Sequence, residues 1–349
     1  MPLGNSKTGN WSGTGQLRGG PKGIWFFITA LRVLGLRLTY ALLVPPALYF
    51  SFVSPDVPAT MDYHRRIFGE LPWWKRRWLV YKHFLSFGRA LIDRTAILAG
   101  GTRHFSFTFD GEHHLREAVA QGRGVLLLTA HLGNWEAGGA LLSRLDVPIN
   151  VTGFDKESAE IRSLLTQASN AKFRLIPLTG SPTDAIQVVA ALRRGEVVAM
   201  LGDRAYGSLS ARIPFLGSPA AFPIGAYIMA AIAGAPLVHV FNVREPGGHY
   251  HFFAFPPQRP KLPRRAEREA RLRDCAARFA QELESILRRA PLQWYNFYPF
   301  WDGPEDKWKS EARNPKPEGS PNSEIRISKP EASRVHASNR FANAKESSP

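Results

Sequence analysis

Apolar residues are spaced along most of the chain in short segments that alternate between two periods. Residues 124–129 form a continuous apolar run, typical of a strand that is buried on both faces. Further strands are predicted at 104–109, 148–154, 173–178, 196–201, 237–243 and 250–255. Helices are predicted at 135–145, 158–169, 183–194, 224–233 and 264–289. This alternation predicts an α/β fold with a mostly parallel central sheet flanked by helices.

The two ends of the chain differ from this central region. Residues 1–23 and 303–349 lack an apolar period, so we expect a disordered leader and a disordered tail. Residues 24–53 are apolar enough to cross a hydrocarbon core of ~30 Å as a membrane-anchor helix. Arg32, Arg37 and the pair Pro45-Pro46 interrupt this stretch, which leaves a helix in the membrane interface as the alternative. Residues 54–302 remain as the folded domain.

A basic, aromatic segment follows the anchor. Residues 72–98 interleave tryptophan, tyrosine and phenylalanine with lysine and arginine in the pattern of an amphipathic helix. This helix either lies on anionic lipid or packs on the core with a solvated basic face. Farther along, Asp110-Gly111 predicts a hairpin or another tight turn.

Charge and cysteine content narrow the class of partner. The formal net charge is +16, and residues 302–349 carry nine Lys or Arg and eight Asp or Glu, so the excess lies outside the tail. A basic body favours a phospholipid surface, phosphorylated lipids, an acidic carrier protein or nucleic acid. The single cysteine, Cys275, excludes an intrachain disulfide framework and a cysteine-rich zinc site.

The candidate chemistry lies directly after the buried strand at 124–129. His131 follows this strand, and ligands of α/β sheets bind beyond the carboxyl ends of strands. Residues five apart on one helix point about 140° away from each other, so His131 and Glu136 can pair only if His131 lies on the turn before the helix. Gly133 permits that turn and Asn134 can cap the helix. His131 would then act as a general base that Glu136 orients, or it would be a packed histidine.

The run from Thr129 to Glu136, Thr-Ala-His-Leu-Gly-Asn-Trp-Glu, closely resembles the signature of the late lipid A biosynthesis acyltransferases, a branch of the lysophospholipid acyltransferase superfamily. Further blocks follow in the family's order: Leu192-Arg193-Arg194-Gly195-Glu196, Leu201-Gly202-Asp203-Arg204, Ile213-Pro214-Phe215-Leu216-Gly217, Ala221-Phe222-Pro223-Ile224-Gly225 and Pro291-Leu292-Gln293-Trp294-Tyr295. The resemblance covers residues 25–301.

This resemblance implies an acyltransferase that uses an acyl carrier protein or coenzyme A thioester as co-substrate, with no other cofactor. It implies His131 as base, Glu136 as its partner, a hydroxyl of a membrane lipid or glycolipid as acceptor, and a bacterial inner membrane location with the catalytic domain on the cytoplasmic side. Two departures leave the acceptor open: Asp203-Arg204 stands where lipid A enzymes usually have Asp-Gln, and Gly153-Phe154 where they have Arg-Pro.

Other residues are candidates for substrate binding. Arg174 is expected to supply a cation near the donor thioester by analogy with the family. Asp203 and Arg204 are placed in the acceptor region, where Arg204 either binds a phosphate or carboxylate or pairs with Asp203. Asn134 is assigned to the helix cap, with substrate contact as the alternative. The remaining histidines lack a cysteine or aspartate cluster around them, so we predict no metal site.

Two other classes of function compete with acyl transfer. A non-catalytic membrane-surface module could retain the acyltransferase fold. A nucleic-acid-binding protein would explain the charge, but the chain carries no recognised reader motif and the apolar anchor argues against it.

Overall fold

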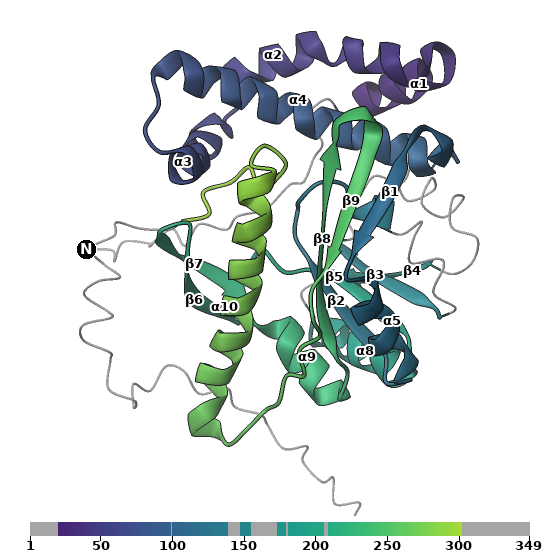
Figure 1. Cartoon of the computed structure of the whole chain (residues 1–349), viewed down its shortest axis with the longest axis vertical. Coiled ribbons are helices and arrows are strands. Elements are labelled where there is room, and N and C mark those ends of the chain that lie inside the picture. The colour runs from purple at the N-terminus through teal and green to yellow at the C-terminus, as the bar shows by residue number, and fades with distance from the viewer. Residues whose placement is uncertain are drawn as a thin grey trace, which may run out of the picture. The chain divides into compact units, whose positions relative to one another are not determined.

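A seven-stranded sheet in the order β1-β9-β8-β2-β5-β3-β4 forms the centre of the computed structural model, which describes residues 20–98, 100–138, 147–154, 173–178, 181–205 and 209–301 (Figure 1). The strands are β1 Ser106–Asp110, β2 Val125–Thr129, β3 Ile149–Phe154, β4 Phe173–Leu178, β5 Val197–Leu201, β8 Leu237–Glu245 and β9 His249–Ala254. All neighbouring pairs are parallel except β8 and β9, which form an antiparallel hairpin. The predicted mostly parallel sheet is therefore confirmed.

Strand β2 lies in the middle of the sheet, and each of its residues is buried. Because side chains alternate along a strand, Leu126 and Leu128 face one side of the sheet and Val125 and Leu127 face the other. Leu126 and Leu128 pack in the larger core with α8 Pro182–Arg193, α9 Gly225–Ala233 and α10 Arg265–Arg289. Val125 and Leu127 pack with Ala118 of α5 Glu112–Ala120. The continuous apolar run is thus explained by helices on both faces.

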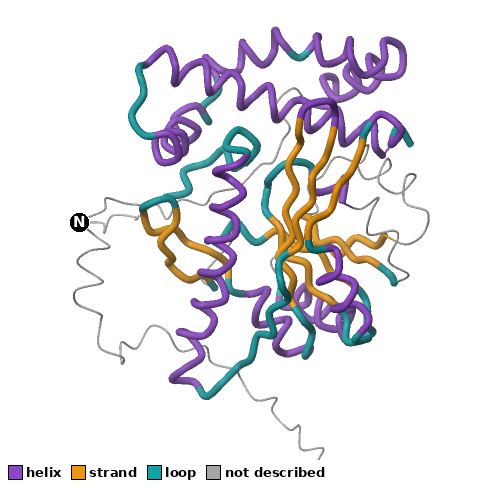
Figure 2. The backbone as a smooth tube through the Cα atoms, viewed as in Figure 1, coloured by secondary structure: helices purple, strands orange, loops and turns teal. Residues whose placement is uncertain are grey.

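The N-terminal segment forms α1 Gly20–Leu42, α2 Val44–Val53, α3 Val57–Phe68 and α4 Trp73–Leu98, which Figure 2 shows as an almost wholly helical region beside the sheet. The predicted anchor at 24–53 is divided between two helices, and α1 begins at Gly20. Gly35 has a non-helical backbone (φ 74°), and Pro45 and Pro46 stand in the first turn of α2, where proline is tolerated. The two prolines therefore start a second helix after α1 has ended.

Several local predictions differ from the structure. Gly111 has φ 77° and ends strand β1 in a tight turn, but the chain continues into α5 and not into a hairpin partner. A second sheet, which the apolar pattern does not predict, pairs β6 Ser210–Phe215 with β7 Ser218–Pro223 through a turn at Leu216 and Gly217. Both turn residues have positive φ, as a type I′ hairpin turn requires.

Some predictions fall wholly or partly outside the described residues. Of the helix predicted at 135–145, only a short 3-10 helix, η2 Trp135–Gly138, is described. The helix predicted at 158–169, residues 1–19 of the leader, residue 302 and the whole tail at 303–349 also lie outside the described part of the chain.

Candidate active site

His131 and Asp203 meet beyond the carboxyl ends of two neighbouring strands. Strand β2 ends at Thr129 and strand β5 at Leu201, and these two residues are paired in register. His131 and Asp203 each follow their strand by one intervening residue, so the parallel register brings them to the same level at the same edge of the sheet. The two side chains are joined by a contact of 2.7 Å between His131 Nδ1 and Asp203 Oδ1.

This contact fixes which nitrogen of His131 carries the proton. An ionised carboxylate only accepts hydrogen bonds, so Nδ1–H of His131 is the donor to Asp203. In the neutral imidazole, Nε2 is then left with a free lone pair. The backbone N–H of His131 also donates to Asp203 Oδ2 at 3.0 Å, which ties the main chain and the ring to one carboxylate. The arrangement presents Nε2 as a general base.

Asp203 is fully buried. Its Oδ2 accepts a further hydrogen bond of 2.8 Å from Nε1 of Trp294. Burial acts to raise the pKa of Asp203, but the charges and hydrogen bonds of His131, together with the charge of Arg204, lower this pKa to about 2. Asp203 is therefore ionised at neutral pH. The sequence analysis placed Asp203 among the substrate-binding residues; in the structure its buried carboxylate accepts hydrogen bonds from the backbone and ring of His131 and from Trp294.

The His131 side chain combines partial exposure with a lowered pKa. Its side chain is 21% exposed, so one edge of the ring remains accessible. Burial lowers the pKa of His131, the carboxylate of Asp203 opposes that change, and the positive charge of Arg204 adds to it. The net direction is downward, which keeps the imidazole unprotonated at neutral pH.

Gly133 and Asn134 shape the loop after His131. Gly133 has φ 63°, and a Cβ placed there would lie 2.3 Å from the carbonyl oxygen of Asn242, so glycine is required both for conformation and for space. The Asn134 side chain accepts a hydrogen bond of 3.2 Å from the Ala137 N–H at the start of η2. The backbone N–H of Asn134 donates to Oδ1 of Asn242 at 2.8 Å. Asn134 is buried and serves as the predicted cap, which leaves its alternative role in substrate contact without support.

A segment that we call the strap, residues 291–296, runs beside the His131 loop. Leu132 and Trp294 form an antiparallel bridge. The Gly133 N–H donates to the Gln293 carbonyl at 2.9 Å, and the Tyr295 N–H donates to the His131 carbonyl at 2.7 Å. The strap therefore fixes the backbone of the loop on both sides of Leu132. The sequence placed this segment in a family block but gave it no role.

The guanidinium of Arg204 contacts the strap. Its Nε donates to Asn296 Oδ1 at 2.9 Å, its Nη2 donates to the Tyr295 carbonyl at 3.2 Å, and its guanidinium lies 5.4 Å from the ring centroid of Tyr298. The two predicted roles were anion binding and an ion pair with Asp203. The hydrogen bonds of Arg204 go to the strap, while its charge still influences the pKa values of His131 and Asp203.

Arg174 is not brought to His131. It lies on edge strand β4. Across the sheet, Arg174 is aligned with Asn150 of β3, Val198 of β5 and Leu126 of β2. Leu126 precedes His131 by five residues. Three strand spacings of roughly 4.8 Å separate β4 from β2. The Arg174 side chain is 62% exposed and lies 3.7 Å from Glu196. Its predicted role beside the donor thioester therefore has no support in the arrangement of the strands.

The predicted partner Glu136 belongs to η2, but its side chain lies outside the described residues. Its contact with His131 stays a prediction. Within the described residues, no group of three or more His, Cys, Asp or Glu side chains is arranged to hold a metal ion.

Comparison with known proteins identifies the family to which the chain belongs. Residues 25–302 match the sequence profile described as bacterial lipid A biosynthesis acyltransferase, which includes His131, Asp203 and the strap. The chain belongs to this acyltransferase family. The resemblance drawn from the Thr129–Glu136 run is therefore confirmed.

Individual members of the acyltransferase family show how far the similarity extends. A phosphatidylinositol mannoside acyltransferase of Mycobacterium tuberculosis is 26% identical over 201 residues, which are 57% of this chain and 61% of the relative. A lipid A biosynthesis lauroyltransferase of Escherichia coli is 29% identical over 203 residues, which are 56% of this chain and 65% of the relative. The chain thus aligns with less than two thirds of each of these relatives.

Among solved structures, the 1-acyl-sn-glycerophosphate acyltransferase of Thermotoga maritima is similar at 12% identity and a TM-score of 0.33. The match covers 70% of this chain and 97% of that protein. A likeness of this degree is too low to support an inference about function.

Proposed function

We propose that this protein is an O-acyltransferase that moves a fatty acyl chain from an acyl carrier protein or coenzyme A thioester to a hydroxyl of a membrane lipid or glycolipid. The observation that carries the proposal is the buried Asp203 carboxylate bonded to Nδ1 of His131, which leaves Nε2 free as a base. Family membership supplies the class of reaction.

The reaction follows from this geometry. His131 Nε2 removes the proton of the acceptor hydroxyl while the oxygen attacks the thioester carbonyl carbon. Asp203 stabilises the imidazolium that forms, because its charge lies 2.7 Å from Nδ1. Collapse of the tetrahedral intermediate breaks the carbon–sulfur bond, and the imidazolium returns the proton to the leaving thiolate. The products are the ester and the free thiol, with no net change in protons.

The test compares His131→Ala with the wild type in transfer from a long-chain acyl thioester to extracted membrane lipids. We expect the variant to lose activity by about 10³-fold or more, because the base is absent. His104→Ala, which changes an exposed histidine at the end of the 3-10 helix Thr102–His104, is the matched control. Full transfer activity of a folded His131→Ala protein would overturn the role of His131 as base, whereas full complementation of a deletion strain by His131→Ala would favour the non-catalytic membrane-surface module.

The acceptor and the donor are separate parts of the proposal. Names of the relatives mention lipid A and phosphatidylinositol mannoside, both of which carry a saccharide on a lipid. Mass spectrometry of total lipids from a deletion strain should show one lipid class that lacks an acyl chain. Parallel assays with acyl carrier protein and coenzyme A thioesters of the same chain length would identify the donor.

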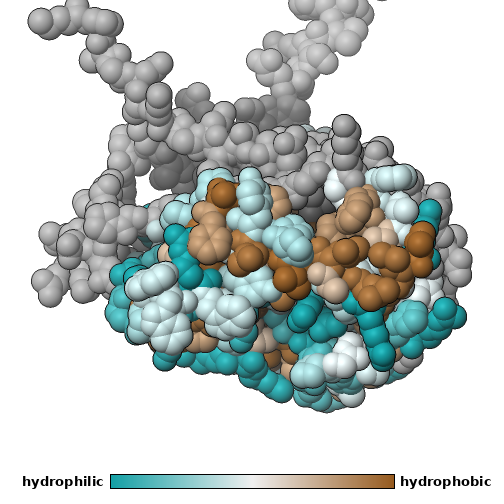
Figure 3. Space-filling model, turned by 90° about the horizontal axis from the view of Figure 1, so that it is seen from above, coloured by the Kyte–Doolittle hydropathy of each residue, from teal (hydrophilic) through white to brown (hydrophobic). Residues whose placement is uncertain are grey.

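Membrane attachment is proposed to occur through the face formed by α1, α2 and the first turns of α4. Trp25–Leu42 is long and apolar enough to cross a membrane. Large exposed apolar side chains of these helices include Trp25, Phe26, Val33, Leu38, Leu48, Phe52, Trp73, Trp74 and Trp78. Figure 3 shows apolar side chains gathered on the side of the molecule that is seen from above. Exposed apolar patches of this kind mark membrane or protein interaction sites.

Cationic residues favour lipid as the partner of this face. Lys75 lies over the Trp74 ring, Lys82 over the Trp78 ring and Arg77 over the Phe52 ring. Tryptophan with lysine and arginine is the combination found at the interface of anionic membranes. We expect the protein to sediment with membranes of the bacterial inner-membrane fraction, and alkaline carbonate washing will distinguish a spanning α1 from one that lies in the interface. Recovery in the soluble fraction would contradict this location.

A further inference from the structure

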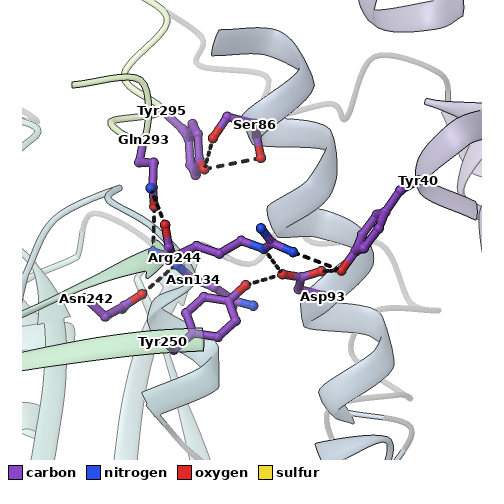
Figure 4. Close-up of polar contacts among 9 residues, drawn as sticks. All are labelled: Tyr40, Ser86, Asp93, Asn134, Asn242, Arg244, Tyr250, Gln293 and Tyr295. Carbon is purple, nitrogen blue, oxygen red and sulfur yellow. Dashed lines mark hydrogen bonds and ion pairs between the residues drawn. The ribbon is translucent and has the colours of Figure 1, made fainter. Parts of the chain in front are cut away.

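A buried carboxylate on α4 gathers three donors from three different elements (Figure 4). Asp93 is fully buried. Its Oδ2 accepts hydrogen bonds from Nε of Arg244 at 2.6 Å and from the hydroxyl of Tyr250 at 2.5 Å. Its Oδ1 accepts from the hydroxyl of Tyr40. Asp93 therefore joins α4 to α1, β8 and β9 in one cluster.

Stability alone is a weak reason for this cluster. Arg244 is 19% exposed and pairs with a carboxylate that has no contact with water, so both charges are largely desolvated. Buried ion pairs often contribute little net stability compared with apolar residues of the same size, although removal of one partner is strongly destabilising. The contacts that the cluster makes with the loop after His131 suggest a different role.

A short route of hydrogen bonds connects Asp93 to that loop. Gln293 binds the backbone of Arg244 twice: its Oε1 accepts from the Arg244 N–H at 2.7 Å, and its Nε2 donates to the Arg244 carbonyl at 2.7 Å. The carbonyl of the same Gln293 accepts the N–H of Gly133 at 2.9 Å. Gln293 of the strap therefore connects the backbone of Arg244 to the loop that carries His131.

Helix α4 holds the strap at two further points on the same face. Ser86 follows His83 by three residues and Asp93 follows Ser86 by seven. At about 100° per residue, these steps end about 60° and about 20° short of full turns, so the three side chains lie within about 80° of one another around the helix axis. Nε2 of His83 donates to the Trp294 carbonyl at 3.0 Å, and Oγ of Ser86 lies 3.1 Å from the hydroxyl of Tyr295. One face of α4 therefore contacts the strap directly at Trp294 and Tyr295 and, through Arg244, at Gln293.

We propose that Asp93 is a positioning residue for the reaction. By fixing Arg244, it determines the position of the strap and hence that of the backbone of His131–Asn134. Because Tyr40 of α1 also binds Asp93, this position depends on the packing of α1. The proposal rests on the proposed function. Because α1 belongs to the face that we assign to lipid, attachment of that face to a membrane and competence of the base are connected through one carboxylate.

The first test is hydrogen exchange, which needs no activity. In Asp93→Asn, peptides covering residues 131–134 should exchange at least about tenfold faster than in the wild type, because the Gly133 and Asn134 N–H bonds loosen. Peptides of strand β2 should keep their protection if the protein remains folded. Unchanged exchange at 131–134 in a folded Asp93→Asn protein would overturn the proposal.

The second test is kinetic and uses milder variants that keep packing. Tyr40→Phe removes one donor from Asp93, and Gln293→Met removes the two bonds to Arg244. We expect kcat to fall by about threefold for the first and by about tenfold or more for the second, with KM for the donor little changed, because a displaced base affects chemistry more than binding. Ser285→Ala, which removes an exposed hydroxyl on α10, is the control for the first variant.

The outcomes separate the two proposals. If Asp93→Asn does not fold, the two milder variants decide, and wild-type kcat and wild-type exchange in both would overturn the positioning role. If kcat falls only as far as the folded fraction falls, Asp93 has a structural role alone and the proposal fails. If the wild type transfers no acyl chain, the proposed function fails, whereas faster exchange of residues 131–134 would still support control of the loop by Asp93.

Discussion

Nδ1 of His131 lies 2.7 Å from Oδ1 of Asp203, and this one contact decides which nitrogen of the ring can act as a base. The carboxylate is buried and ionised, so the proton of the neutral imidazole stays on Nδ1. The contact joins residues that are 72 positions apart in the sequence.

The substitution Asp203→Asn should remove the control over which His131 nitrogen carries the proton, with little change in the shape of the side chain at position 203. We expect kcat to fall by about 10²–10⁴-fold, because the amide can stabilise the wrong tautomer and cannot stabilise the imidazolium. The carboxylate raises the pKa of His131, so its loss should move the acid limb of the kcat/KM profile to lower pH. A pH–rate profile of both proteins checks this. An acid limb that moves to higher pH would contradict the assignment.

Activity of the wild type should depend on the lowered pKa of His131. Only the neutral ring is a base, so kcat/KM should be constant near neutral pH and fall as pH decreases through that pKa, which lies below the ordinary value of about 6.5. Titration of the ring by NMR, in protein labelled at histidine, should give the same midpoint as the kinetics. A kinetic midpoint at or above the ordinary value would be inconsistent with a buried base.

The buried pair His64 and His83 should make the fold sensitive to acid. His83 donates from Nε2 to the Trp294 carbonyl, so its Nδ1 must accept from Nε2 of His64 at 3.1 Å, and both rings are neutral. Burial lowers the pKa of His64 to about 4 and that of His83 in the same direction. Below pH 6.5 the unfolded chain therefore binds protons that the folded chain does not, and stability falls.

Each such proton costs about 1.4 kcal/mol of unfolding free energy per pH unit. Denaturant unfolding between pH 6.5 and pH 5 should show a slope of up to about twice this value, because two rings contribute, and His64→Gln should reduce the slope by up to about 1.4 kcal/mol per pH unit. An equal slope in His64→Gln and the wild type would show that the pair does not titrate in this way.

Gly133→Ala should disrupt the loop more than an ordinary glycine substitution. The new Cβ would lie 2.3 Å from the Asn242 carbonyl oxygen, in addition to the cost of φ 63°. Gly69→Ala is the matched control, because Gly69 has φ 75° with open space around its Cβ position. The control should lose ~1–2 kcal/mol of unfolding free energy, and Gly133→Ala should lose roughly 1–3 kcal/mol more, together with most of its activity. Equal losses in both variants would show that close packing on Asn242 is unimportant.

Trp294→Phe should separate the hydrogen bond of the indole from its packing. Nε1 of Trp294 donates to Asp203 at 2.8 Å, and the ring is buried among Tyr63, Phe215 and Phe300. Loss of a bond to a buried carboxylate costs roughly 1.5–3 kcal/mol, and a smaller ring adds a cavity term. We expect lower unfolding free energy and a kcat reduced by about tenfold, whereas Ile186→Val at an exposed position of α8 should change neither.

Much of the fold could be predicted from the chain because local pattern and burial agree there. The run Val125–Thr129 is apolar at each of its first four positions, and the structure buries it between two helical layers. The hairpin of β6 and β7 escaped prediction, because its strands alternate weakly and include Pro214, Pro219 and Pro223. The break of the anchor near Pro45 agrees with the interruption that the proline pair indicates, whereas the apolar pattern gives no sign of the backbone change at Gly35.

The sequence by itself determined that a histidine follows a buried strand, that Gly133 and Asn134 can turn the chain after it, and that the run belongs to an acyltransferase family. It could not determine the partner of the base, because partners in a parallel sheet are chosen by strand order and register. Only the pairing of Thr129 with Leu201 brings Asp203 to His131, and only the packing of α4 on the strap joins Asp93 to the same loop. Those contacts depend on residues far apart in the chain, and local pattern carries no record of them.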